Sequence, residues 1–304
     1  MSAAFFHSLY GLTVESEFPL PGAAVVPPGA ADALVRHAPK ARPILSPVTG
    51  LFNLTQDAGA FVFDFPDGVQ VVVTSDAKRI ELSWPPPFTS DYAATYLMNV
   101  VMSFVMRLRG HATLHASAVL IDGAAIVFPG VSGAGKSTIA AMLALRGFPV
   151  ITEDVTAIVD RGTTFGVVSG HTRVRLWPDV AALLFGSAEA LPLIAGKEWK
   201  RYFDVSDHFA HGTFDVAAIY SIDDRKPRAP RIEALESADA LLDLIAASYK
   251  PDFQMTGDEF DLLGRIARHV PARLVIPNVD VATAAVMIDA IVEDVRAGRM
   301  SQTT

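Results

Sequence analysis

The first 88 residues alternate apolar and polar positions in short runs, as strands do. Residues 61–75, FVFDFPDGVQVVVTS, hold two such runs around a Pro-Asp-Gly turn and predict a β-hairpin. RIELSW at 79–84 predicts the next strand, which is stopped by three prolines. Residues 19–47 are rich in proline, alanine and glycine and predict connecting loop with room for one short helix. A β-rich N-terminal region, residues 1–88, is therefore expected.

An apolar segment follows the prolines, and we expect a connecting helix over residues 90–109. Thr89 or Ser90 can cap it. Asn99 and Ser103 interrupt its apolar run, which is also short for a membrane span. The pattern therefore favours a buried helix over a transmembrane one.

The rest of the chain mixes strand and helix patterns. In TLHASAVLIDGAAIVFPG (113–130), two apolar runs flank Asp122-Gly123, which predicts a tight hairpin. The strand that ends before residue 130 then has an antiparallel neighbour, so the sheet is expected to be mixed. Further strands are predicted at 148–160, 164–169, 172–177, 216–223 and 272–277, and helices at 137–146, 237–249, 257–269 and 281–297. We expect an α/β domain spanning 89–304 behind the β-rich region.

Residues 130–137, GVSGAGKS, match the phosphate-binding pattern G-x-x-x-x-G-K-[ST] at every fixed position. Glycines let backbone N–H groups turn inward around an anion, the lysine brings a cation to the β and γ phosphates, and the serine hydroxyl can bind Mg²⁺. A β run precedes the motif and a helix pattern follows it, as the motif requires. The nucleotide-binding residues expected are Gly130, Ser132, Gly133, Ala134, Gly135, Lys136, Ser137 and Thr138.

Two acids and a histidine are candidates for the chemistry. Glu153 and Asp154 lie in the predicted strand 148–160, which follows the loop helix after a short connection. We expect that strand to neighbour the one that feeds the loop, which would bring both acids toward bound phosphates. One carboxylate can bind Mg²⁺ and the other can accept a proton from an attacking hydroxyl; a solvated pair at a strand end is the alternative. His115 can hydrogen-bond a catalytic carboxylate or be an ordinary buried histidine.

Two arginines alternate on the predicted strand TRVRLW. Because side chains of a strand alternate between its faces, Arg173 and Arg175 are expected on one face. Two guanidiniums there can bind a phosphate or a carboxylate, although exposed arginines on a strand face are common. The basic cluster in GKEWKRYFDV (196–205) is predicted to be a solvated turn, with a mobile loop that contacts nucleotide or acceptor as the alternative.

Composition narrows the classes of function. The net charge of −8 and the pI of about 5.4 argue against a nucleic-acid partner. The absence of cysteine excludes disulfides, thiolate metal sites and cysteine nucleophiles. The start of the chain has no signal-peptide pattern, so a cytoplasmic protein without a membrane partner is expected.

Residues 113–160 resemble the core of bacterial HPr kinase/phosphorylase, which has a histidine strand, a hairpin, a GxSGxGKS loop, a helix ending in RG and an acidic pair. The resemblance implies a P-loop kinase core of the phosphoenolpyruvate-carboxykinase-like type, with ATP and Mg²⁺ as cofactors. It implies catalytic roles for His115, Glu153 and Asp154. Lys136 of the phosphate-binding motif is also a catalytic candidate, because it can stabilise charge on the transferring phosphoryl group. Asp154 is assigned with Ser137 to the metal and Glu153 to the base, or these two acidic roles are exchanged.

Two differences point to a divergent branch of that family. The chain has Glu153 where the family has an aspartate, and VSGHTRVRLWPD where the family has a glycine-rich segment. With its YGLTVESEFPLPG start, it resembles the kinases associated with lasso-peptide biosynthesis, which implies transfer of the γ-phosphoryl of ATP to a serine of a precursor peptide, typically C-terminal. HPr, a small molecule, or a nucleotide-sensing role without transfer are the alternatives, and homo-oligomerisation stays open.

Overall fold

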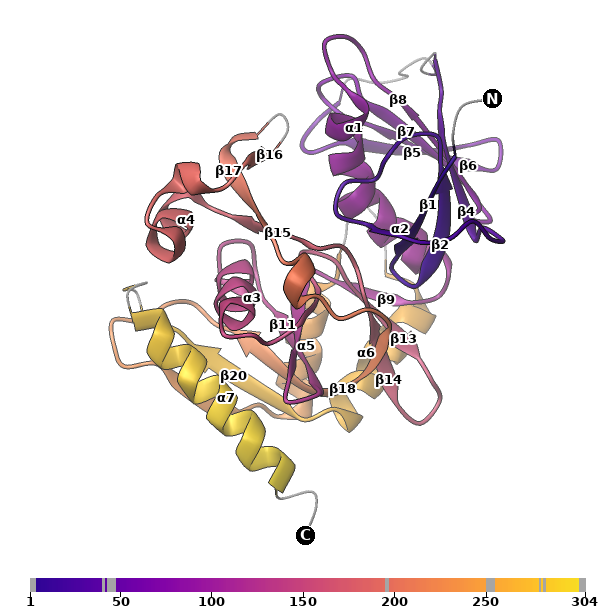
Figure 1. The fold of residues 1–304 in the computed structure, drawn as a ribbon. Coiled ribbons are helices and arrows are strands. Elements are labelled where there is room, and N and C mark those ends of the chain that lie inside the picture. Colours follow the sequence, from indigo (N-terminus) through magenta and orange to yellow (C-terminus); the bar gives the residue numbers. More distant parts are fainter. Residues whose placement is uncertain are drawn as a thin grey trace.

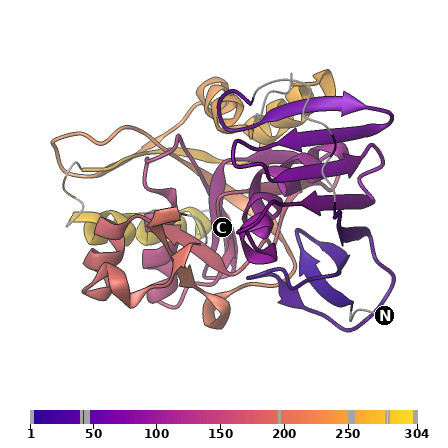
Figure 2. The ribbon, with the colours of Figure 1, turned by 90° about the horizontal axis from the view of Figure 1, so that it is seen from above.

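We describe a computed structural model of the chain for residues 4–39, 42, 48–194, 197–249, 255–278, 280 and 283–300. It is a mixed α/β protein in which two large mixed sheets are joined by a helical segment (Figure 1). Seen from above, the first sheet lies to one side of the second sheet (Figure 2).

The first sheet is built entirely from residues 5–83 and has the strand order β3-β1-β2-β4-β8-β7-β6-β5. The expected hairpin at 61–75 is confirmed, since β6 and β7 pair antiparallel. The expectation of loop over 19–47 is wrong for its described part, which contains two strands and no helix. One of them, β4, pairs parallel with β2 and β8, so tertiary pairing gives Ala33–His37 a strand despite flanking proline and glycine. The strands are β1 (Phe5–Leu9), β2 (Leu12–Ser16), β3 (Ala24–Val25), β4 (Ala33–His37), β5 (Asn53–Asp57), β6 (Ala60–Asp64), β7 (Gln70–Thr74) and β8 (Arg79–Ser83).

The expected connecting helix is present as one helical segment with a π-helical turn in its middle. It comprises α1 (Ser90–Tyr96), the π-helix Leu97–Val101 and α2 (Met102–Leu108). Thr89 caps it, because its Oγ1 accepts a hydrogen bond from the Tyr92 N–H at 3.4 Å. The segment shares a hydrophobic core with the first sheet, and that core also takes in Ala157 and Val168 of the second. Among the described helices, none combines the length and hydropathy needed to cross a bilayer.

The second sheet has the strand order β12-β10-β11-β18-β14-β13-β9, with β20 beside β18 and β19 beside β20. At its centre β11, β18 and β20 run parallel, so all three end at the same edge. The strands are β9 (Ala112–Leu114), β10 (Ala116–Ile121), β11 (Ala124–Pro129), β12 (Val150–Thr152), β13 (Thr156–Asp160), β14 (Phe165–Val168), β18 (Thr213–Ile222), β19 (Arg231–Ala234) and β20 (Ala272–Ile276).

The hairpin at Asp122-Gly123 is confirmed, because β10 and β11 pair antiparallel across that turn. The expected neighbour of the acidic strand is wrong: β12 pairs with β10 and not with β11. The space on the other side of β11 is taken by β18. The strand before the acids is therefore one position further from the phosphate loop than the short connection suggested.

Helices cover both faces of the second sheet. Alternate residues of β11 face two different cores: Ile126 and Phe128 pack with α3 and α7, and Ala125 and Val127 pack with α5 and α6. This burial on both faces explains the unbroken apolar run before the phosphate loop. The helices are α3 (Lys136–Leu145), α5 (Ser237–Ala247), α6 (Gly257–His269) and α7 (Ala284–Met300).

A three-stranded sheet and one short helix project beside α3 (Figure 1). The sheet has the order β15-β17-β16, and it includes the basic cluster expected in a turn. That expectation is wrong, because those residues pair with β15 and β16 as a strand. The elements are β15 (Arg173–Leu176), α4 (Pro178–Phe185), β16 (Leu193–Ile194) and β17 (Lys197–Asp204).

Candidate functional site

The phosphate-binding motif forms the loop between β11 and α3. Gly130 leaves little room for a side chain, since a Cβ there would lie 3.3 Å from the Ile222 Cβ and 3.2 Å from the Ala134 Cβ. Gly133 and Gly135 have φ of +86° and +116°, in the region that favours glycine. These three glycines fold the loop tightly over the end of the parallel strands, with its backbone N–H groups at the start of α3.

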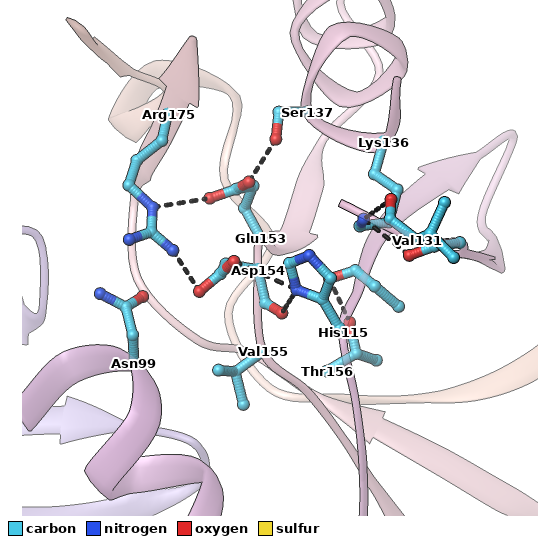
Figure 3. Close-up of polar contacts among 12 residues, drawn as sticks. Asn99, His115, Val131, Lys136, Ser137, Glu153, Asp154, Val155, Thr156 and Arg175 are labelled. Atoms are coloured by element: carbon cyan, nitrogen blue, oxygen red, sulfur yellow. Dashed lines mark hydrogen bonds and ion pairs between the residues drawn. The ribbon is translucent and has the colours of Figure 1, made fainter. Parts of the chain in front are cut away.

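Lys136 lies inside this loop (Figure 3). Its Nζ donates hydrogen bonds to the carbonyl oxygens of Gly130 and Val131, each at 2.8 Å, and the residue is 5% exposed. Burial lowers the pKa of Lys136 to about 8, although the nearby Asp154 and Glu153 carboxylates act in the opposite direction. The ammonium group of Lys136 is thus buried in the loop, and the nearby carboxylates only partly offset the cost of burying its charge.

We expect the affinity for ATP to fall as pH rises above about 8, where Lys136 of the free protein loses its proton. Bound phosphates require the charged ammonium, so above that pH binding must include proton uptake and weakens about tenfold per pH unit. Titration calorimetry at pH 7 and pH 9 measures the change. Lys136→Arg, which stays charged, should show a flat profile; a flat profile for the native lysine would contradict the prediction.

The acidic pair lies in the break between β12 and β13 rather than within one continuous strand as expected. Asp154 has φ of +69°, a left-handed conformation that aspartate tolerates better than most residues. In a regular strand, two successive side chains would point to opposite faces. The break lets both carboxylates approach Arg175, whose Nε lies 3.8 Å from Glu153 Oε2 and whose Nη2 contacts Asp154 Oδ2. A strained residue that makes both acids converge is typical of a functional site.

Glu153 is directed at the phosphate loop. The Ser137 hydroxyl donates a hydrogen bond of 2.5 Å to its Oε1 (Figure 3). Its buried Oε2 has no hydrogen-bond partner in the described part of the chain. Burial raises the pKa of Glu153, and Arg175 only partly offsets this. A positive charge beside its Oε2 would lower this pKa and favour the carboxylate form of Glu153.

These oxygens fit Mg²⁺, which prefers carboxylate and hydroxyl ligands completed by water and substrate phosphates. Ser137 Oγ lies at the start of α3 against Glu153 Oε1, and Glu153 Oε2 lies 3.8 Å from Arg175 Nε without a hydrogen-bond partner among the described residues. Within the described ranges, no group of three or more His, Asp or Glu side chains could hold a metal ion by itself. A magnesium ion here would accordingly arrive together with the phosphates of a nucleotide.

Asp154 is held by two basic side chains. His115 Nδ1 lies 3.2 Å from its Oδ1, and Arg175 pairs with its Oδ2 (Figure 3). Burial alone would raise the pKa of Asp154, but Arg175 and the hydrogen bond from His115 outweigh it and keep the pKa well below its usual range. Asp154 is thus a fixed, ionised carboxylate, and of the two roles left open for His115 the contact with a site carboxylate is the one found here.

The two arginines share one face of β15, as the alternation predicted, and have different surroundings. Val174 and Leu176 are buried on the opposite face. Arg175 is committed to the acids, whereas the Arg173 guanidinium lies 4.7 Å from the centre of the Tyr202 ring. Both arginines line a hollow between β15 and the helical segment 90–108, together with Asp91, Asn99, His171 and Tyr202. This hollow adjoins the acidic pair.

Two further residues at the site were missed by the sequence interpretation. The Tyr249 ring stands edge-on to His115 at 5.9 Å between ring centres, and nothing in the sequence around the end of α5 indicated it. Lys200 Nζ lies 4.8 Å from the centre of the Trp177 ring, and its charge contributes to lowering the pKa of Asp154. For Lys200 the signal was the basic cluster, which we had interpreted as a turn.

Comparisons with known proteins leave the family of this chain open. No protein-family model matches the chain, and no curated protein matches it. Among solved structures, it is similar to the HPr(Ser) kinase/phosphatase from Coxiella burnetii, with 14% sequence identity and a TM-score of 0.36. The match covers 63% of this chain and 99% of that one.

Proposed function

We propose that this protein is an ATP-dependent kinase that transfers the γ-phosphoryl group to an acceptor hydroxyl. The observation that carries the proposal is the contact between Ser137 of the phosphate loop and Glu153, with Asp154 next to it in the chain and fixed by His115 and Arg175. Phosphoryl transfer needs a phosphate cradle, a metal site and an acceptor-orienting carboxylate close together. The proposal assigns them to the loop at 130–137, to Ser137 with Glu153, and to Asp154, and the contacts among these residues support it.

The geometry favours exchanging the two acidic roles first assigned. Glu153, not Asp154, contacts the hydroxyl of Ser137, so we assign Ser137 and Glu153 to Mg²⁺. When bound, the ion would neutralise charge on the β and γ phosphate oxygens. Lys136 and the loop N–H groups stabilise negative charge on the transferring group.

Asp154 then orients the acceptor hydroxyl and takes its proton. Because its pKa is held low, it stays ionised at working pH, and it acts mainly by positioning the hydroxyl, with proton transfer late in the reaction. His115 positions Asp154 and does not touch the acceptor in this scheme. Arg175 balances the charge of both acids when no nucleotide is bound.

For the acceptor we propose a serine of a peptide, with a lasso-peptide precursor as the specific candidate. The support is the resemblance of the YGLTVESEFPLPG start, the His115 hairpin and the RVRLWPD segment to that branch of kinases. The hollow beside the acids adds support: Arg173 lines it and offers a guanidinium that can bind a carboxylate of the acceptor. HPr or a small molecule would use the same apparatus.

Incubation with γ-labelled ATP tests the proposal. The acceptors are a lasso precursor ending in serine, the same peptide ending in alanine, and HPr. We expect label on the serine peptide alone. Label on HPr instead would leave the kinase standing and overturn the peptide acceptor. ATP binding without transfer to any of the three would count against catalysis and favour a nucleotide-sensing role.

A further inference from the structure

A second hollow adjoins the phosphate loop on the side away from the acids. It lies at the edge where the parallel strands β11, β18 and β20 end, between α3 and α7 and the segments after β18 and β20. Ligands of open α/β sheets bind outside the carboxyl ends of the strands, at this kind of edge. Two residues of the phosphate loop, Ala134 and Gly135, also line this hollow.

The walls of the hollow suit a flat apolar ring. Ile139 and Met142 of α3 form one wall, and Ala284 and Met287 of α7 form another. The two residues of each pair are three positions apart in the sequence, which places them on the same face of their helix. A mostly apolar pocket with a few polar groups at its rim is typical of sites for small organic ligands.

A cation marks the end of the hollow nearest the loop. A Cβ on Gly135 would lie 3.9 Å from Arg225 Nη2, so the guanidinium is beside the phosphate-binding turn. Arg225 shares the lining of the hollow with Asn278 and Asp280, which follow β20. A guanidinium in this place suits a phosphate or ribose oxygen of a ligand that extends from the loop into the hollow.

We propose that this hollow binds the base of a nucleoside triphosphate whose phosphates lie in the loop; the inference rests on the proposed function. Ser137 and Thr138 are neighbours about 100° apart around α3. Ser137 contacts Glu153, and Thr138 lines the hollow. The two ends of the ligand would therefore lie on opposite sides of the loop. The base would lie beside α7, and the terminal phosphate would face the acids. Figure 1 shows α3 between β15 and α7, in agreement with this division.

The test compares ATP with inorganic tripolyphosphate, which has no base, in the presence of Mg²⁺. Ala284→Leu partly fills the hollow at the start of α7 without a ring that could stack on a base. We expect it to weaken ATP about tenfold or more, equivalent to about 1.4 kcal/mol, and to leave tripolyphosphate unchanged. The matched control is Ala285→Leu, the same change at an exposed position of the same helix, which should alter neither. Titration calorimetry measures both affinities, and thermal unfolding checks that the variants are folded.

The outcomes separate the two proposals. If the unmodified chain binds both ligands and Ala284→Leu weakens neither, or weakens both equally, the base lies elsewhere while the phosphate loop stands. If the unmodified chain binds neither ligand, the proposed function fails at the loop and this inference fails with it.

Discussion

Asp154→Asn is expected to reduce the rate of phosphoryl transfer by about 10²- to 10⁴-fold while ATP still binds. The amide is close in shape to the carboxylate, but it cannot accept the proton of an acceptor hydroxyl and it no longer balances Arg175. Binding should persist because the contacts between Glu153, Ser137 and the loop are unchanged. Transfer from labelled ATP and calorimetric binding of ATP measure the two effects separately.

The same substitution is expected to lower stability. Removal of one partner from a buried ion pair costs about 3–5 kcal/mol, and the Asp154 side chain is only 11% exposed. Asp154→Glu provides the second variant, since it keeps the charge and displaces the carboxylate; it should fold and transfer slowly. Asp57→Asn, at an exposed position of the first sheet, is the control. Normal transfer by a folded Asp154→Asn would remove Asp154 from the mechanism.

Lys136→Met is expected to weaken ATP binding and to reduce transfer by about 10²- to 10³-fold, the usual effect of removing one donor to a developing negative charge. Lys136 Nζ donates its hydrogen bonds to loop carbonyls among the described residues, so the substitution removes no hydrogen bond from a described carboxylate. Burial lowers the pKa of Lys136 to about 8, so the lysine is still mainly charged at pH 7, and burying that charge costs folding stability. We therefore expect the folding stability of this variant to be equal to or above that of the native chain.

Transfer assays, calorimetry and thermal unfolding at pH 7 are the measurements for Lys136→Met. Lys78→Met, at an exposed turn between β7 and β8, serves as the matched control and should change neither binding nor transfer. A loss of transfer accompanied by unfolding would point to a structural role for Lys136, and unchanged ATP affinity would contradict its role in binding phosphate.

Much of the fold was predictable because local rules dominate it. The hairpin at Asp122-Gly123 follows from a two-residue turn between apolar runs, and the helices at 237–247 and 257–269 follow from periodicity with short-range signals at their ends. The strand β4 was missed because its identity depends on pairing with β2 and β8, which are distant from one another in the sequence. Sheet order is likewise a matter of long-range pairing, so the short connection before β12 gave the wrong neighbour.

The residues alone predicted a phosphate-binding turn between β11 and α3, since glycine spacing, a lysine and a serine are a local pattern typical of such turns. They also supplied the acids, the histidine and the paired arginines as candidates. Only the tertiary structure decided how these residues meet. The left-handed conformation of Asp154 directs two adjacent carboxylates toward the guanidinium of Arg175. Glu153 then contacts Ser137, and Asp154 contacts His115. The reason is physical, since a motif within a few residues is governed by local backbone geometry, whereas contacts among β9, β12 and β15 depend on how the whole sheet is assembled.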